Sequence, residues 1–189
     1  MRNLAKRIFD LFFSVTGLII FSPLLAALSL VILLTLGRPI LYSPKRTGVS
    51  GNLFTMRKFR TMTPGTGTSS HHSGDDDPRL TQVGRWIRKF KLDELPQLWN
   101  IAKGEMSFVG PRPALYNQED LIALRTEKGV EKLLPGITGW AQVNGRDELS
   151  IPDKVALDVE YLNRQSFWFD MKILWMTFLK VMKRDGVKH

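Results

Sequence analysis

The 189-residue sequence contains no cysteine, and this absence excludes disulfide bonds, thiolate metal sites and catalysis by a thiol. Acidic residues are scarce relative to basic ones, 18 against 27, which gives a formal charge of +9. Such a charge calls for an anionic partner, either nucleic acid, an acidic membrane surface or a phosphorylated substrate. Composition does not distinguish these three classes of partner. The length of the chain is typical of a single domain.

Charged residues are absent from Leu11 to Leu36, a run dominated by leucine, isoleucine, valine, phenylalanine and alanine. An apolar run of this length predicts a membrane segment. A cleavable signal peptide is the alternative interpretation. The run is too long for the apolar region of a signal peptide, however, and no small-residue cleavage site follows it.

The pair Ser22-Pro23 falls near the middle of this segment, where proline removes a helical hydrogen bond. Each half is then roughly 18 to 20 Å long, short of the ~30 Å hydrocarbon core. Because cationic flanks prefer the cytoplasmic side, a helix-break-helix hairpin that enters and leaves by one face is slightly favoured over a kinked spanning helix. The cationic residues at the two ends are Arg2, Lys6 and Arg7, and Arg38, Lys45 and Arg46.

Two adjacent carboxylates, Asp93 and Glu94, stand between a basic run and the start of an apolar helix. We predict that Asp93 caps this helix, that Glu94 lies in its first turn, and that the helix stops near Gly104. The positive end of the helix dipole should keep Asp93 ionised, and upstream cations such as Arg88 would let the neighbourhood hold phosphate. An ordinary capping acid beside surface charges is the alternative, because acids open many helices.

Short strands make up a small part of the predicted fold. Residues 40–42 and 53–56 are expected to form a hairpin through the turn residues 48–52. The other apolar patterns are helical. We therefore predict an α/β fold that is mostly α, with a membrane hairpin at 1–38 and a second domain at 39–189.

The basic segment 58–62, which carries Lys58 and Arg60, leads into a polar stretch at 63–77. The composition of this stretch predicts a loop. Its histidines and aspartates could hold a metal, although neighbouring side chains in a glycine-rich loop are more often solvated. We expect order to resume at Asp77.

In the tripeptide Pro111-Arg112-Pro113, two prolines hold one arginine on an extended backbone. A fixed arginine suits bidentate binding of phosphate or carboxylate. A rigid connector with a solvent-facing charge explains the tripeptide equally well.

Segment 135–146 is rich in glycine and in hydrogen-bonding side chains, including Gln142, Asn144 and Arg146. We predict a loop whose backbone approaches a ligand closely. The preceding residues 117–128 are predicted to form an amphipathic helix.

The next predicted helix runs from about residue 152 to 163, and Asp158 lies at the edge of its apolar stripe. A carboxylate on a buried face is rare unless it is paired or functional. Arg146 or Arg112 is the expected counter-ion.

Aromatic and aliphatic side chains from Phe167 to Leu179 share one helical face, and lysines surround the other. This pattern is typical of an amphipathic helix in a membrane interface. A helix that covers the protein's own core has the same pattern. Because a membrane segment is already predicted at the N-terminus, we favour the interfacial interpretation.

Several ordered motifs behind the apolar segment together carry a family resemblance. They are Lys58-Phe59-Arg60-Thr61-Met62, Leu92 through Leu98, Ser107 through Pro113, Pro135 through Arg146, and Leu157-Asp158-Val159-Glu160-Tyr161. Over nearly its whole length the chain closely resembles the bacterial sugar transferase family, the monotopic phosphoglycosyl transferases, in its minimal catalytic form. It departs from the family pattern at Glu105, where aspartate is usual, and this change preserves the charge.

The resemblance implies a re-entrant helix broken at Ser22-Pro23 and a catalytic domain at the cytoplasmic face of the bacterial inner membrane. It also implies transfer of a phosphosugar from a UDP-sugar to polyprenyl (undecaprenyl) phosphate, with release of UMP, as the first membrane step of glycoconjugate biosynthesis. By the same resemblance, Asp93 is the nucleophile and Glu94 is its partner at Mg2+.

A direct reaction would bring two phosphates together, so a carboxylate that first accepts the phosphosugar divides the reaction into two displacements. In this hypothesis Mg2+, Arg88 and the helix N-terminus cancel the repulsion between carboxylate and diphosphate. We predict Asp93, Glu94 and Arg88 as catalytic residues, with Asp93 and Glu94 as metal ligands. The predicted substrate-binding residues are Lys58, Arg60, Pro111, Arg112, Gln142, Asn144, Arg146 and Asp158.

Two other functions fit part of the sequence. A membrane-anchored basic protein that binds anionic lipid or nucleic acid explains the charge and the two amphipathic ends, but not the acids at 93, 94 and 158. A membrane-bound phosphatase would share the aspartyl chemistry and use water as acceptor. We expect a UDP-sugar, polyprenyl phosphate and membrane lipid as partners, and no nucleic acid. The sequence leaves open the sugar, the polymer and the oligomeric state, including a homo-oligomer.

Overall fold

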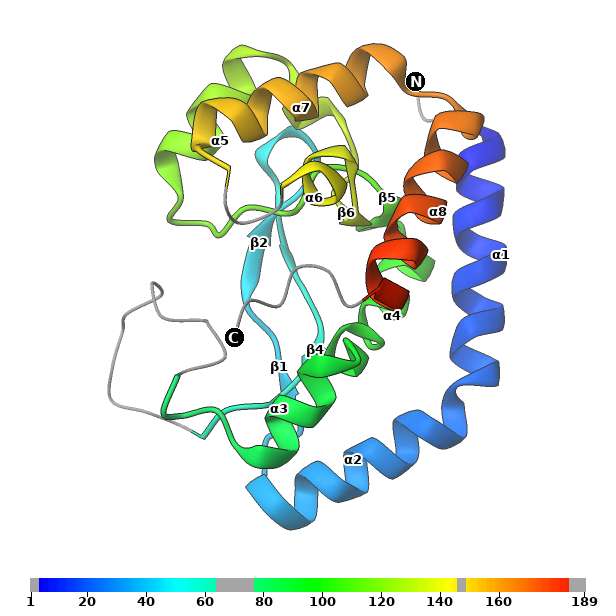
Figure 1. The fold of residues 1–189 in the computed structure, drawn as a ribbon, viewed down its shortest axis with the longest axis vertical. Helices are drawn as coiled ribbons and strands as arrows, with labels where there is room; N and C mark the ends of the chain where they lie inside the picture. Colours follow the sequence, from blue (N-terminus) through cyan, green and yellow to red (C-terminus); the bar gives the residue numbers. More distant parts are fainter. Residues whose placement is uncertain (1–3, 64–76, 146–148, 184–189) are drawn as a thin grey trace.

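Two N-terminal helices, α1 (Leu4–Ile20) and α2 (Ser22–Leu36), run along one side and one end of the molecule (Figure 1). The computed structural model describes residues 4–63, 77–145 and 149–183. The two helices meet at an angle of 60°. Within the described ranges, neither has the length and apolar character needed to cross a membrane alone, whereas the bent pair has them jointly.

The bend lies at Phe21, directly before Ser22-Pro23, as the position of the proline predicted. Pro23 falls in the first turn of α2, where a missing N–H costs nothing. The carbonyl of Ile19 would have paired with that N–H in a continuous helix. It accepts a hydrogen bond from the Ser22 hydroxyl instead, at 2.8 Å. The pair Ser22-Pro23 thus forms the break and satisfies its backbone.

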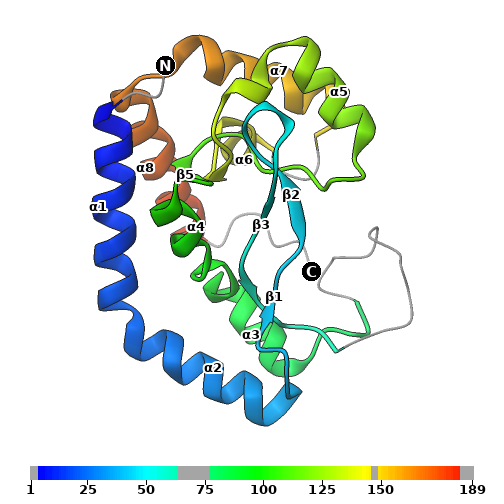
Figure 2. The same cartoon turned by 180° about the vertical axis from the view of Figure 1, so that it is seen from behind.

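A long antiparallel hairpin runs through the middle of the molecule (Figure 2). Strand β2 (Lys45–Thr47) pairs with β3 (Leu53–Thr55), and β1 (Leu41–Tyr42) pairs with β4 (Lys58–Phe59). The prediction that 40–42 pairs with 53–56 is therefore wrong. The turn η1 (Val49–Gly51) was correctly placed, and it sets the register by bringing Thr47 opposite Leu53.

The predicted ligand loop at 135–146 is instead a strand followed by a helix. Strand β6 (Gly136–Thr138) pairs in parallel with β5 (Ser107–Val109), and α6 (Trp140–Asn144) follows. A Cβ on Gly139 would collide with the carbonyl of Gly110. Glycine is needed at 139 because protein backbone packs against it, which gives this glycine a structural reason other than a ligand.

The remaining helices surround the hairpin and confirm a mostly helical α/β fold. Helices α5 (Glu119–Glu127) and α7 (Ile151–Arg164) lie side by side at one end (Figure 1). Helix α7 matches its predicted span, and the turn η3 (Val130–Lys132) follows α5. Helix α8 (Phe167–Lys183) lies beside α1 in both cartoon views. Helices α3 (Gln82–Lys89) and α4 (Gln97–Lys103) complete the described fold, with the turn η2 (Leu92–Glu94) between them.

Polar side chains of α1 attach it to the rest of the protein. The Lys6 ammonium donates to the Val109 carbonyl at 3.0 Å and forms an ion pair with Asp170 of α8. One carboxylate oxygen of Asp10, which is buried, accepts the Phe108 N–H at 3.1 Å. Helix α1 is therefore part of the folded body and is not a separate anchor on a linker.

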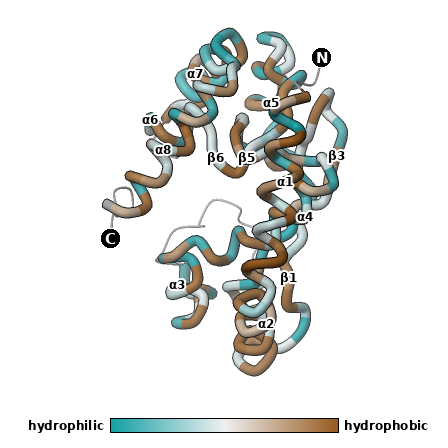
Figure 3. The backbone as a smooth tube through the Cα atoms, turned by 90° about the vertical axis from the view of Figure 1, so that its right-hand side faces the viewer, coloured by the Kyte–Doolittle hydropathy of each residue, from teal (hydrophilic) through white to brown (hydrophobic). Residues whose placement is uncertain are grey.

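Large apolar side chains remain exposed on α1, α2 and α8, and Figure 3 shows how hydrophobic residues follow the first two helices. Helix α8 combines the two roles that the sequence left open. Its Phe169 and Ile173 are buried in the main core, whereas Trp168 and Trp175 are 79% and 60% exposed. The predicted single apolar face is thus divided between the core and the surface.

Candidate active site

Asp93 and Glu94 lie in the 3-10 turn η2, ahead of α4. The prediction that Asp93 caps the helix is wrong, since Pro96 occupies the N-cap position. Proline has no N–H to continue α-helical bonding backwards, so the turn closes through shorter bonds such as Leu95 N–H to the Leu92 carbonyl. The predicted end of the helix at Gly104, where φ is 82°, is confirmed.

Glu94 is the carboxylate that contacts the cations. Its Oε1 accepts a hydrogen bond from Lys58 Nζ at 2.8 Å and lies 3.9 Å from Arg112 Nη1. Its side chain is only 16% exposed. Burial by itself would raise the pKa of Glu94, but Lys58 and Arg112 outweigh burial and lower that pKa to about 2. Glu94 is therefore firmly ionised.

Asp93 has the opposite balance. Burial raises the pKa of Asp93, and the opposing charges of Lys58 and Arg88 do not cancel this effect, to which Glu94 also adds. The expected support from an α-helix N-terminus is not found, because α4 begins only at Gln97. Asp93 is thus the more basic carboxylate of the pair.

Arg88, near the end of α3, is oriented by a residue that the sequence analysis missed. Its Nε donates to the hydroxyl of the buried Thr61 at 3.0 Å. Thr61 belongs to the basic motif 58–62, but only the two cations of that motif, Lys58 and Arg60, were predicted to bind substrate. A contact between residues 27 positions apart has no local sequence signal.

Hydrogen bonds tie down the backbone that carries Arg112. The four carbonyls of residues 111–114 accept, in order, the N–H of Gly136 at 2.9 Å, the guanidinium of Arg125 at 2.8 Å, that of Arg46 at 3.4 Å, and the N–H of Thr47 at 3.0 Å. The side chain of Arg112 keeps 37% of its surface exposed. A fixed backbone with an accessible guanidinium supports the prediction of a positioned arginine.

Asp158 pairs with Arg125 and not with Arg112, one of its two expected counter-ions, while the other, Arg146, lies outside the described residues. Its Oδ2 accepts from Arg125 Nε at 2.9 Å and Nη2 at 2.6 Å, and both side chains are buried. The third contact of Arg125, to the Arg112 carbonyl, connects this pair to the site. Asp158 therefore orients Arg112 through an intermediary on α5, a helix predicted only from its apolar face.

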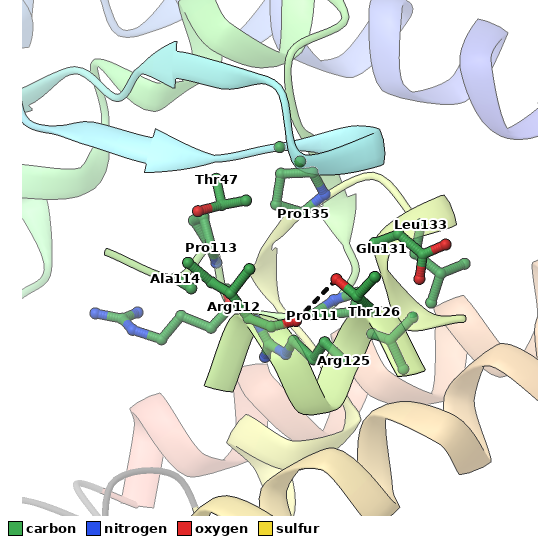
Figure 4. Close-up of a pocket in the computed structure, with 14 residues that line it drawn as sticks. Thr47, Pro111, Arg112, Pro113, Ala114, Arg125, Thr126, Glu131, Leu133 and Pro135 are labelled. Carbon is green, nitrogen blue, oxygen red and sulfur yellow. Dashed lines mark hydrogen bonds between the residues drawn. The ribbon is translucent and has the colours of Figure 1, made fainter. Parts of the chain in front are cut away.

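Two pockets border Arg112. The first, with about 210 Å³ of space that includes open solvent, is lined by Arg46, Met56, Lys58, Gln97, Arg112, Pro113 and Gly136. The second, with about 420 Å³ of such space, includes Thr47, Pro111, Thr126, Glu131 and Pro135 (Figure 4). In Figure 4 the side chain of Arg112 points away from Arg125 and Thr126. The smaller pocket contains Lys58, and it is therefore the one directly beside the carboxylate pair.

A family model described as bacterial sugar transferase matches residues 1–184. The chain belongs to the bacterial sugar transferase family. Across 186 residues it is 43% identical to a Bacillus subtilis (strain 168) protein named uncharacterized sugar transferase EpsL, a match that covers 97% of this chain and 90% of the relative.

Two longer relatives carry names that state an activity. The chain is 41% identical over 186 residues to the undecaprenyl-phosphate glucose phosphotransferase of Komagataeibacter xylinus, covering 92% of this chain and 35% of the relative. It is 36% identical over 188 residues to the UDP-glucose:undecaprenyl-phosphate glucose-1-phosphate transferase of Escherichia coli (strain K12), covering 95% and 40%. The chain thus spans less than half the length of these two proteins.

Three predicted substrate-binding residues of this sugar transferase lie outside the cluster around Glu94. The buried guanidinium of Arg60 donates to the carbonyls of Leu36, Gly37 and Arg38, where it closes the end of α2. The amides of Gln142 and Asn144 donate to backbone carbonyls of their own segment, at 2.9 and 2.8 Å. Arg146 and the histidines of the 63–77 stretch lie outside the described residues.

The described residues contain no group of three acids or histidines placed to hold a metal. The transferase does offer two adjacent carboxylates, one of them firmly ionised. Mg2+ usually binds through one or two carboxylates together with substrate phosphates and water. The two carboxylates of Asp93 and Glu94 fit this pattern of coordination, and substrate phosphate oxygens would complete the coordination of the ion.

Proposed function

We propose that this protein transfers a sugar phosphate from a UDP-sugar to polyprenyl phosphate and releases UMP. One observation carries the proposal: two neighbouring carboxyls with opposite pKa shifts lie among Lys58, Arg88 and Arg112. The names of the two longer relatives, which state transfer to undecaprenyl phosphate, support the same reaction.

In the first step a carboxylate oxygen of Asp93 attacks the β-phosphorus of the UDP-sugar. The new bond joins this oxygen to phosphorus, and the bond from phosphorus to the bridging oxygen breaks, so that UMP leaves. In the second step a phosphate oxygen of the polyprenyl phosphate attacks the same phosphorus and releases Asp93. The higher pKa of Asp93 makes it the better nucleophile of the pair.

The other residues stabilise charge on the transferred group. Thr61 holds the guanidinium of Arg88, Arg125 holds the backbone of Arg112, and Lys58 holds Glu94 in place. Asp93 and Glu94 would hold Mg2+, which supplies further neutralisation of phosphate charge when it is bound. Preorganised cations of this kind account for most of the catalysis of phosphoryl transfer.

We propose that α1 and α2 form a re-entrant hairpin in the cytoplasmic face of the bacterial inner membrane. The 60° bend, the serine that satisfies the break and the exposed apolar residues of both helices support this placement. Exposed tryptophans on α8 add a second contact with the interface. The site would then meet a soluble nucleotide sugar and a lipid phosphate at one surface.

The direct test is UMP release from a panel of UDP-sugars by the full-length protein in nanodiscs, with polyprenyl phosphate and Mg2+. We expect sustained release of UMP only when both a UDP-sugar and the lipid phosphate are present, and at most one UMP per protein without the lipid. Sustained turnover without lipid phosphate would identify a phosphatase instead. Salt-sensitive binding of nucleic acid without UMP release would favour a binding protein.

A further inference from the structure

Arg46, on strand β2, is a cation beside the site that neither the motifs nor the proposed mechanism use. Its Nη1 donates to the Pro113 carbonyl at 3.4 Å, a long hydrogen bond. Its Nε is buried and has no hydrogen-bond partner in the described part of the chain. Arg46 lines the smaller of the two pockets together with Lys58 and Arg112.

Positive charge exceeds negative charge around this pocket. Arg46, Lys58 and Arg112 all line it, and none of its lining residues is acidic. Glu94, whose charge also acts on Arg46, already contacts Lys58 and Arg112. Burial, followed by repulsion from Arg112, lowers the pKa of Arg46 to about 10. A partly buried cation against a second cation is costly unless an anion balances the two.

We propose that Arg46 is a substrate-binding residue that contacts the diphosphate of the nucleotide sugar in this pocket, together with Lys58 and Arg112. This inference rests on the proposed function, because that function supplies the diphosphate. Paired N–H groups of one guanidinium can bind two oxygens of one phosphate side by side. A lysine at this position would supply the charge without that paired geometry.

The hairpin holds Arg46 in place. Its backbone pairs with Phe54 on β3 and bridges to Leu115 on the other edge. The preceding residue, Lys45, is exposed and carries the same charge on the same strand. Lys45→Gln is therefore a matched control for a nonspecific loss of positive charge.

The experiment measures binding of UDP, UMP, uridine and short-chain polyprenyl phosphate to the full-length protein in nanodiscs by calorimetry. We expect Arg46→Gln to weaken UDP binding by about tenfold or more, as loss of a charge-assisted hydrogen bond does. Uridine binding should stay unchanged, and Lys45→Gln should match the wild type. A stronger effect on polyprenyl phosphate than on UDP would assign the pocket to the lipid and overturn the proposal.

Two further measurements keep the test decisive. Arg46→Lys preserves the charge, so it replaces Arg46→Gln in the test if Arg46→Gln lowers the unfolding temperature. We expect Arg46→Lys to bind UDP more weakly than the wild type but more tightly than Arg46→Gln. Wild-type UDP affinity in a folded Arg46 variant contradicts the inference alone. If the wild type binds UDP through Arg46 but releases no UMP from any UDP-sugar, the proposed function fails while the anion site stands.

Discussion

Asp93 and Glu94 differ in their charge behaviour because the cations Lys58 and Arg112 outweigh burial at Glu94, whereas burial outweighs the nearby cations at Asp93. Lys58 donates to Glu94, and the pKa of Glu94 falls to about 2, whereas burial keeps the pKa of Asp93 above its ordinary value. Two adjacent carboxyls with pKa values pushed apart are suited to different roles. Glu94 suits a permanent charge and Asp93 suits a nucleophile.

Lys58→Met should move the acid limb of the pH profile of kcat/KM to higher pH by about one unit or more, because Lys58 lowers the pKa of both carboxyls and Asp93, the more basic of the two, must be ionised to attack. The lowered pKa of Glu94 also makes the stability of the fold depend on pH. Ionised Glu94 stabilises the fold above its ordinary pKa of 4.5, and this contribution is lost as the pH falls toward 2. Lys103→Met is the control, since Lys103 lies 3.8 Å from Glu105 away from the site. An unmoved acid limb in Lys58→Met would contradict the assignment.

Thr61→Val should lower kcat by about tenfold, because it removes the hydroxyl that accepts from Arg88 Nε while keeping the shape of the side chain. Thr61→Ser retains the hydroxyl and should keep kcat within about threefold of the wild type. Steady-state UMP release measures both, and the unfolding temperature monitors the fold. Equal rates in the two variants would show that Arg88 needs no such support.

The sequence predicted part of this cluster. Asp93, Glu94, Lys58, Arg88 and Arg112 were all named from motifs, and the structure places them together or on adjoining elements. No role in the site was predicted for three supporting residues: Arg125 was not named, Thr61 was named only as part of a motif, and Arg46 only as a cation that flanks the apolar segment. Each acts through a partner distant in the chain, and local patterns of charge and hydrophobicity carry no information about such partners.

Among the elements, α4 is the one that joins the site to the N-terminal helices. The guanidinium of Arg7 on α1 donates to the carbonyls of Ile101 and Ala102 at the end of α4, both at 2.7 Å. A cation on the last carbonyls of a helix also opposes the negative end of its dipole. The helix that follows the carboxylate pair is therefore fixed by the proposed membrane segment.

Arg7→Met should lower the free energy of unfolding by about 1–3 kcal/mol and the unfolding temperature by about 3–10 °C. The reason is that two carbonyls lose a charged donor. Thermal unfolding in detergent measures the change, with Lys132→Met, which alters an exposed lysine on η3, as control. A shift no larger than that of the control would show that Arg7 does not hold α4.

Prediction of the elements succeeded where the signal is local. The break at Ser22-Pro23, the end of α4 at Gly104 and the span of α7 all depend on nearby residues, and all were found. The strand pair β5–β6 was missed because three-residue strands 29 positions apart leave no periodic pattern. The glycines of 135–146 are as compatible with a ligand-binding loop as with the close backbone packing that the structure shows, so the sequence did not distinguish the two.

At the scale of the whole molecule, the exposed apolar residues of α1, α2 and α8 define the proposed membrane surface. Helix α8 is attached to α1 through the ion pair between Lys6 and Asp170, so the three helices form one support for the catalytic part. This arrangement explains why the aromatic face of α8 is divided between core and surface.

Variants that retain one tryptophan each test this surface. In vesicles with brominated lipid, we expect strong fluorescence quenching for Trp168 and Trp175, whose rings would lie at the interface. Trp140 should be quenched little, because its ring packs on Phe169 and its indole N–H donates to Glu160 at 2.7 Å. Quenching of Trp140 to the same extent as Trp175 would place the membrane elsewhere.

The central claim is that Asp93 accepts the phosphosugar covalently. Full-length protein in nanodiscs is incubated with a UDP-sugar and Mg2+ but without lipid phosphate, and intact-protein mass spectrometry then looks for one added sugar phosphate. Asp120→Asn, which changes an exposed acid on α5, is the control and should form the adduct as the wild type does. The account predicts that Asp93→Asn forms no adduct and transfers no sugar phosphate, and an adduct on Asp93→Asn would contradict it.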